Sequence, residues 1–178
     1  MLSICYEHVG RFQEAQAMLE KGFKGWSPAT KNVRFYMAAK FPQKDLQVTK
    51  GFAEALVNLG LPGEPSGFYK ISADNQLTGE EMRELFYGRK VTGFTLGTGK
   101  QWWIERSQEG KATIRDGDNA GTGKSWVEDD MLCDQWDNLY ESLKDCWVVY
   151  RNPEGTPENS DEYLGAPGYG IYPFSLAE

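Results

Sequence analysis

Residues 90–115 read KVTGFTLGTGKQWWIERSQEGKATIR and decide the fold of the C-terminal part of the chain. Short runs of β-branched and aromatic residues alternate here with turns that contain glycine. The pattern predicts three strands, at 91–96, 101–106 and 111–115. Alternation supports the last two, because Trp102 and Ile104 share one strand face and Ala112 and Ile114 share another.

The same pattern continues toward the C-terminus. Further strands are predicted at 124–127, 131–136 and 146–150. A spacing of roughly ten residues between strands is typical of an antiparallel meander that closes into a small barrel or forms a curled sheet. Tyr163 and the segment 171–174 are candidates for a last edge strand. Thr78 and Glu81 form a capping box, which predicts one short helix that packs its apolar face on the sheet.

The first sixty residues indicate helices instead. The turn at 9–15, with Gly10 and Ala15, resembles the junction between the two helices of a tetratricopeptide repeat, and because the match begins mid-repeat we expect further repeats upstream of Met1. A later helix ends at Gly60 and Pro62. The predicted fold class is α+β: an N-terminal α-helical repeat fragment, then a small antiparallel β-barrel or curled β-sheet packed by one short helix. Its predicted parts are a tetratricopeptide-like fragment (1–62), a linker (63–76) and a small calycin-like β-domain (77–178).

Composition excludes several classes of function. The chain has 178 residues and a formal net charge of −7. It has no cluster of Lys and Arg, so a nucleic-acid partner is not expected. No apolar run approaches the ~20 residues of a membrane helix, and the N-terminus does not resemble a secretory signal, so we expect a soluble, cytoplasmic protein without a membrane partner.

Several short motifs resemble binding or catalytic sites, but each lacks residues or neighbouring elements that such a site requires. Residues 120–125 read AGTGKS and resemble the end of a phosphate-binding loop, but Asp118 occupies the place of the first glycine and a strand follows, so we interpret them as a hairpin turn. The acidic run 128–130 is also interpreted as a turn rather than a cation site. His8 is the single histidine, which leaves no catalytic triad. We therefore predict no catalytic residue, no metal and no cofactor.

Cys133 and Cys146 are the most informative cysteines. A hairpin that turns around Leu139 and Tyr140 places them directly opposite each other, at a Cβ–Cβ distance of about 4.5–5.5 Å. That distance permits a disulfide. A reducing cytosol favours two small buried thiols, so we prefer thiols and keep the disulfide as the alternative.

Five of the six tryptophans fall in the β-region. They are the candidate ligand-binding or partner-binding residues: Trp102, Trp103, Trp126, Trp136 and Trp147. The simpler interpretation is that these tryptophans form a hydrophobic core. The more specific one is that they form an aromatic cavity or surface patch for an apolar ligand or a protein partner. Trp102 and Trp103 are adjacent in one strand and must point to opposite faces, so Trp103 is the best candidate for an outward position.

The segment 52–62, FAEALVNLGLP, resembles the end of the helical array in bacterial adenylate/guanylate cyclase-like proteins with tetratricopeptide repeats. The β-region resembles a small domain appended to such proteins, through matches at 77–81, 88–93, Gly121 with Trp126, 132–133, Trp136, and Cys146 with 149–151. The resemblance implies the non-catalytic C-terminal part of a signalling protein whose parent is a class III nucleotide cyclase. The metal-binding carboxylates and the purine-selecting pair of that family have no counterpart here.

Three hypotheses of function follow. The first is a non-catalytic regulatory module that senses a small apolar ligand or docks on a protein partner, including the catalytic domain of the same polypeptide. The second is a structural cap of a helical repeat array, which predicts no cavity in the β-domain. The third is a small hydrolase that uses carboxylates such as Glu105, Asp116 or Glu128, which requires two acids in one cleft.

Overall fold

The structure is a computed structural model that describes residues 10–26, 28–40, 46–64, 69–95, 98–167 and 170–177. The chain divides into two units. Unit 1 comprises Met1–Tyr69 with Leu96–Gly99, and unit 2 comprises Lys70–Thr95 with Lys100–Glu178. The segment 70–76, part of the predicted linker, therefore lies within unit 2.

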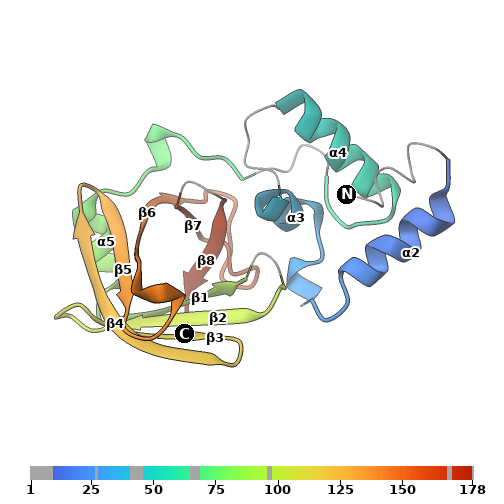
Figure 1. Cartoon of the computed structure of the whole chain (residues 1–178). Coiled ribbons are helices and arrows are strands. Elements are labelled where there is room, and N and C mark those ends of the chain that lie inside the picture. Colours follow the sequence, from blue (N-terminus) through green and yellow to red (C-terminus); the bar gives the residue numbers. More distant parts are fainter. Residues whose placement is uncertain are drawn as a thin grey trace. The chain divides into compact units, whose positions relative to one another are not determined.

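Unit 1 is helical among its described residues (Figure 1). Its elements are α2 (Phe12–Gly22), η1 (Pro28–Thr30), α3 (Val33–Lys40) and α4 (Leu46–Asn58). The Phe23 and Trp26 rings lie 4.8 Å apart, and the Trp26 ring lies 5.9 Å from that of Phe35. Gly60 has φ +90°, which confirms the predicted left-handed end of the helix.

The tetratricopeptide-like interpretation of unit 1 is not supported. In α2 only Ala15 and Leu19 are buried, whereas Phe12 is 54% exposed and Met18 40% exposed. Two large apolar residues of this helix therefore lie on the surface. Ring contacts in unit 1 join Phe23 and Trp26, at the end of α2 and in the connection after it, to Phe35 and Tyr36 of α3.

Unit 2 contains eight strands that form a closed antiparallel barrel (Figure 1). The strands are β1 (Arg89–Phe94), β2 (Gln101–Arg106), β3 (Lys111–Asp116), β4 (Asn119–Glu128), β5 (Met131–Trp136), β6 (Lys144–Arg151), β7 (Tyr163–Ala166) and β8 (Tyr172–Leu176). β8 closes the barrel against β1, with Val91 opposite Leu176. The predicted barrel is confirmed. Tyr163 and most of the segment 171–174 lie in strands, as predicted, but neither strand is an edge, because closure removes both edges.

The segment 120–125 corrects another prediction. It lies inside β4, and the turn is at Gly117 and Asp118, because Asp116 pairs with Asn119. A Cβ on Gly123 would lie 2.2 Å from the backbone oxygen of Gln135, so glycine is required for the approach of β5. Glycines that indicate a turn in the sequence thus serve here to bring two strands together.

The acidic segment 128–130 is a turn, as predicted. Glu128 pairs with Met131, and the two residues between them, Asp129 and Asp130, have φ values of 49° and 54°. Positive φ at both central positions is the geometry of the two-residue turns that best match strand twist.

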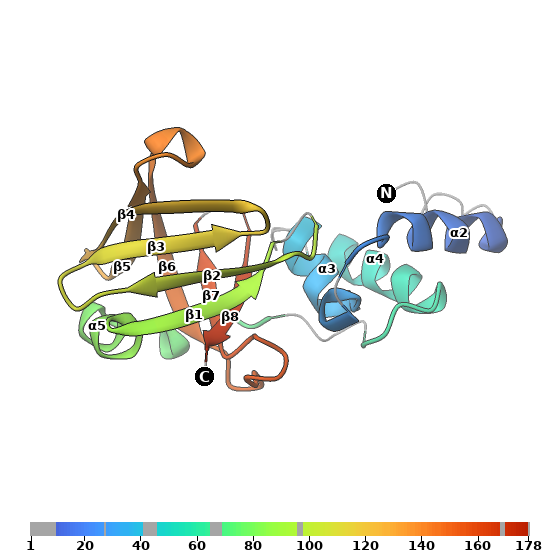
Figure 2. The same ribbon diagram turned by 90° about the horizontal axis from the view of Figure 1, so that it is seen from below.

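Helix α5 (Gly79–Phe86) begins at the predicted capping box. The Thr78 N–H donates to Glu81 Oε2 at 2.8 Å, and the Glu81 N–H donates to Thr78 Oγ1 at 3.3 Å. Met82 and Phe86 are fully buried in the core of the barrel. In Figure 2, α5 lies at the lower side of the barrel and the 3-10 turn η3 (Tyr140–Ser142) at its upper side. Helix α5 therefore fills one end of the barrel.

Candidate functional site

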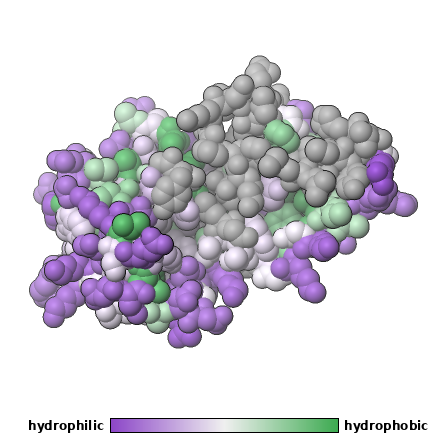
Figure 3. Space-filling model, in the orientation of Figure 1, coloured by the Kyte–Doolittle hydropathy of each residue, from purple (hydrophilic) through white to green (hydrophobic). Residues whose placement is uncertain are grey.

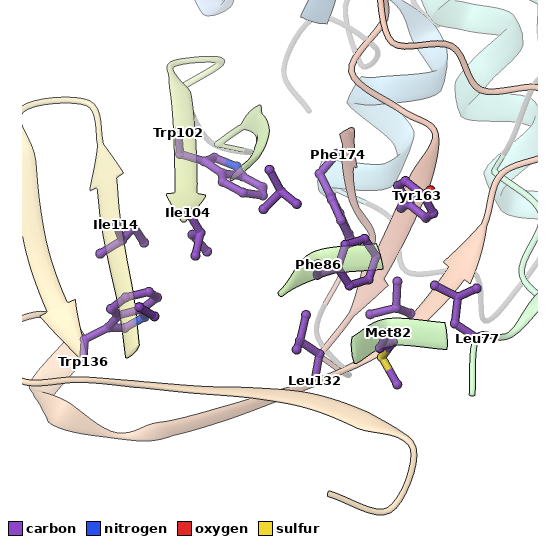
Figure 4. Close-up of a cluster of buried hydrophobic side chains, with 13 residues drawn as sticks. Leu77, Met82, Phe86, Trp102, Ile104, Ile114, Leu132, Trp136, Tyr163 and Phe174 are labelled. Carbon is purple, nitrogen blue, oxygen red and sulfur yellow. The ribbon is translucent and has the colours of Figure 1, made fainter. Parts of the chain in front are cut away.

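The interior of the barrel contains a cavity of about 460 Å³. We call it the barrel cavity; it is lined by Thr95, Trp102, Ile104, Ile114, Asp116, Asp134, Trp136, Tyr140, Leu143, Lys144, Asp145, Trp147 and Tyr172. Figure 4 shows Phe86 and Met82 grouped with Leu132 near α5, while Ile114 and Trp136 project from β3 and β5 apart from that group. The α5 end is thus packed, and the hollow part lies toward η3. A cavity of this size matches the range of small-molecule sites.

Three of the five candidate tryptophans line the barrel cavity, namely Trp102, Trp136 and Trp147. Trp102 is 6% exposed and Trp136 is 4% exposed. The Trp147 ring lies 5.0 Å from that of Tyr172, at an interplanar angle of 40°. A Cβ on Gly165 would lie 2.2 Å from the Trp147 ring, so this glycine makes room for the indole.

The other two candidate tryptophans lie outside the barrel cavity. Trp103 alternates with the buried Trp102 and Ile104, and Lys90 Nζ lies 4.2 Å from its ring centroid. Trp126 donates from Nε1 to Glu128 Oε2 at 2.8 Å, and Lys144 Nζ lies 5.4 Å from its ring centroid. The predicted outward position of Trp103 is confirmed, and both rings are partly covered by a cation on the outer face.

A buried ion pair lies in the barrel interior. Arg106 Nη2 donates to Asp134 Oδ2 at 2.7 Å, and Arg106 Nε donates to Ser125 Oγ at 2.8 Å. The Arg106 side chain is 3% exposed and that of Asp134 is 8% exposed. Asp134 Oδ1 is buried and has no hydrogen-bond partner among the residues that the structure describes. A buried carboxylate oxygen without a donor is costly, and it marks a position where a ligand can donate.

Polar side chains surround the η3 end of the barrel cavity. Asp116 accepts from Thr95 Oγ1 at 2.7 Å and from Tyr140 Oη at 2.8 Å. Tyr140 is 53% exposed and Leu143 is 63% exposed, so large apolar groups face solvent at this end. Burial, and then the nearby charge of Asp145, raise the pKa of the Tyr172 hydroxyl.

Sequence reasoning missed Arg106, Asp134 and Asp145. The signal for Arg106 was present, because alternation from Trp102 through Ile104 places residue 106 on the same inward face. Asp134 sits between Leu132 and Trp136 in the same way. An inward arginine and an inward aspartate on two strands of one barrel are a candidate pair, because a buried charge needs a partner.

The acids proposed for a hydrolase do not converge in one cleft. Of the three, only Asp116 lines the barrel cavity, while Glu105 is exposed on β2. Glu128 is on the outer face, where hydrogen bonds from Lys144 and Trp126 hold the pKa of its carboxyl below its usual range. The geometry that the hydrolase hypothesis requires is therefore not found for these residues.

Cys133 and Cys146 are directly opposite each other on β5 and β6, as predicted. Their Cα atoms are 4.0 Å apart, and the sulfurs are joined in a disulfide. This corrects the preference for two free thiols. The reason is the register, which brings the two side chains together on the outer face of adjacent strands.

We expect reduction of this disulfide to lower the free energy of unfolding by about 3 kcal/mol, because opening a short loop restores chain entropy to the unfolded state. Urea unfolding with and without a reductant measures the difference. The variant Cys133→Ala/Cys146→Ala is the control and should not respond to the reductant. Equal unfolding curves for the natural chain with and without reductant would mean that the sulfurs are free thiols.

No family model, curated protein or solved structure matches this chain. Among the described residues, no helix is both long enough and apolar enough to cross a membrane. In the same part of the chain, no group of three or more His, Cys, Asp or Glu side chains is placed to hold a metal ion.

Proposed function

We propose that unit 2 is a non-catalytic ligand-binding barrel that takes a small, largely apolar organic molecule in the barrel cavity. The observation that carries this proposal is the cavity of about 460 Å³ behind a packed α5 end. Its walls include three tryptophans and two isoleucines, and its charged lining residues are three aspartates and Lys144. Apolar walls with a small number of placed polar groups are the usual composition of small-molecule sites.

The competing hypotheses have less support. The structural-cap hypothesis expects a β-domain with no cavity, which does not fit the hollow interior. For protein docking, Figure 3 shows hydrophobic residues only in small separate patches on the visible face of the barrel. A docking face usually needs a larger apolar area. Three further properties remain predictions from the sequence. They are a protein partner, a cyclase-like parent protein and a regulatory role in signalling.

The disulfide gives information about the cellular compartment in which the protein binds its ligand. Structural disulfides persist in oxidising environments and are rare in the cytosol. The Cys133–Cys146 bond therefore weighs against the cytoplasmic location expected from the sequence.

A cavity-filling substitution tests the proposed function. N-phenyl-1-naphthylamine is an uncharged aromatic probe whose fluorescence rises in apolar surroundings, and we expect one molecule to bind per chain. Ile114→Trp places an indole in the barrel cavity and should weaken binding at least about tenfold, which corresponds to about 1.4 kcal/mol.

The matched control is Thr113→Trp. Thr113 is the neighbour of Ile114 on β3 and is exposed, so its indole adds to the outer face and binding should not change. The proposal is wrong if the natural chain does not bind the probe, or if the two variants weaken binding equally.

A further inference from the structure

We propose that the ligand of the barrel cavity is an organic cation, an amine with an aromatic or otherwise apolar body, whose ammonium group lies between Asp134 and Asp145. This inference rests on the proposed function, because it requires an open barrel cavity. It adds the charge and the chemical class of the ligand.

One carboxylate oxygen of Asp134 accepts no hydrogen bond from the described residues. Asp134 lines the barrel cavity, and Arg106 donates to its Oδ2, whereas its enclosed Oδ1 accepts from no donor among the described residues. A ligand group that reaches this carboxylate can therefore satisfy Oδ1. A carboxylate accepts hydrogen bonds and donates none, so the ligand group must be a donor. A charged donor such as an ammonium group makes a stronger hydrogen bond to a carboxylate than a neutral donor does.

A second carboxylate, that of Asp145, lies beside the carboxylate of Asp134. Asp145 on β6 is the register partner of Asp134 on β5, and it also lines the barrel cavity. Directly opposed residues have Cβ atoms about 4.5–5.5 Å apart. Asp145 Oδ2 accepts from Trp147 Nε1 at 2.8 Å, which orients its carboxyl group. One ammonium group can donate to two carboxylates at this spacing, because it carries three N–H donors.

The cationic side chains near these carboxylates already have partners. Lys144 is the one cation among the lining residues, and its Nζ donates to Glu128 at 2.7 Å on the outer face. Arg106 is committed to Asp134 and Ser125. Asp116 adds a third carboxylate at the η3 end. The lining therefore favours a positive ligand charge and disfavours a negative one.

Aromatic side chains lie on the same face of the strands as the two carboxylates. Trp136 lies two residues from Asp134 along β5, and Trp147 lies two residues from Asp145 along β6, so both indoles share the inward face of the carboxylates. Aromatic faces attract cations, most strongly in the absence of water. The carboxylates thus specify the charged group, and the indoles accept both that group and an apolar body.

Three probes of similar size and different charge test the inference by calorimetric titration of the whole chain at neutral pH. They are 2-phenylethylamine, which is protonated, 2-phenylethanol, which is neutral, and 3-phenylpropanoate, which is an anion. We expect the amine to bind at least about tenfold tighter than the alcohol, and the anion to bind most weakly.

Asp145→Asn provides the matching variant. The amide oxygen still accepts from Trp147 Nε1, but the charge is lost, so amine binding should weaken about tenfold while alcohol binding stays the same. The control is Asp118→Asn, which removes an equal charge from an exposed side chain outside the barrel cavity. It should leave all three affinities unchanged.

The outcomes separate this inference from the proposed function. Binding of the alcohol or the anion as tightly as the amine would overturn the inference and leave the proposed function intact. Failure of all three probes and of N-phenyl-1-naphthylamine would overturn both. If Asp145→Asn does not fold, the order of the three affinities in the natural chain still decides the question.

Discussion

Replacing Arg106 by methionine is expected to lower the free energy of unfolding by about 3–5 kcal/mol, because Asp134 is then left buried without its charge partner. The side chains of the pair are 3% and 8% exposed, so water does little to relieve the loss. Urea unfolding followed by tryptophan fluorescence measures the change in unit 2, which contains five of the six tryptophans.

Two further variants show that the pair itself is responsible. Arg115→Met removes an exposed arginine from β3 and should change stability by less than about 0.5 kcal/mol. Arg106→Met/Asp134→Leu removes both charges and should recover most of the lost stability, because no buried charge is left unpaired. If the double variant is as unstable as Arg106→Met, loss of packing rather than loss of the charge partner is the cause.

Replacing Phe86 by alanine is the second change with a large expected effect, about 3–5 kcal/mol of unfolding free energy. Phe86 is fully buried at the end of α5, and its ring centroid lies 5.1 Å from that of Tyr163 and 5.5 Å from that of Phe174. Removing the ring leaves a void in the packed end of the barrel, and the closed sheet has little freedom to collapse into it.

Leu143→Ala is the control for this experiment. Leu143 is a large apolar residue in the same unit, but it is 63% exposed, so its truncation should cost less than about 0.5 kcal/mol. The same urea unfolding experiment compares the two variants. A loss at Phe86 no larger than the loss at Leu143 would mean that α5 does not hold the barrel together.

Local sequence patterns were enough to predict much of unit 2. Alternation placed Trp102 and Ile104 inward and Trp103 outward, and the structure has them so. The spacing of Thr78 and Glu81 placed the start of α5. Hairpin geometry placed Cys133 opposite Cys146. Each of these features depends on residues close in the sequence, where side-chain period and cap chemistry decide the outcome.

Features that depend on long-range pairing were not predictable in the same way. The glycines of β4 serve a close approach to β5, which no local pattern distinguishes from a turn. The contact between Arg106 and Asp134 joins positions that are 28 residues apart. Barrel closure between β1 and β8 brings together opposite ends of unit 2. The barrel cavity exists because the sheet closes, so the positions of Trp136 and Trp147 in its wall and of Trp126 outside it came only from the structure.

The most direct test of the central claim is a ¹H–¹⁵N NMR titration of the tryptophan indole N–H signals with 2-phenylethanol, a neutral aromatic probe. Binding in the barrel cavity predicts that the signals of Trp102, Trp136 and Trp147 shift together and saturate, because the probe ring lies beside them. The signals of Trp103 and Trp126 should stay in place, since both rings lie outside the barrel cavity. Shifts confined to Trp103 and Trp126, or no saturable shift at any indole, would contradict a ligand site inside the barrel.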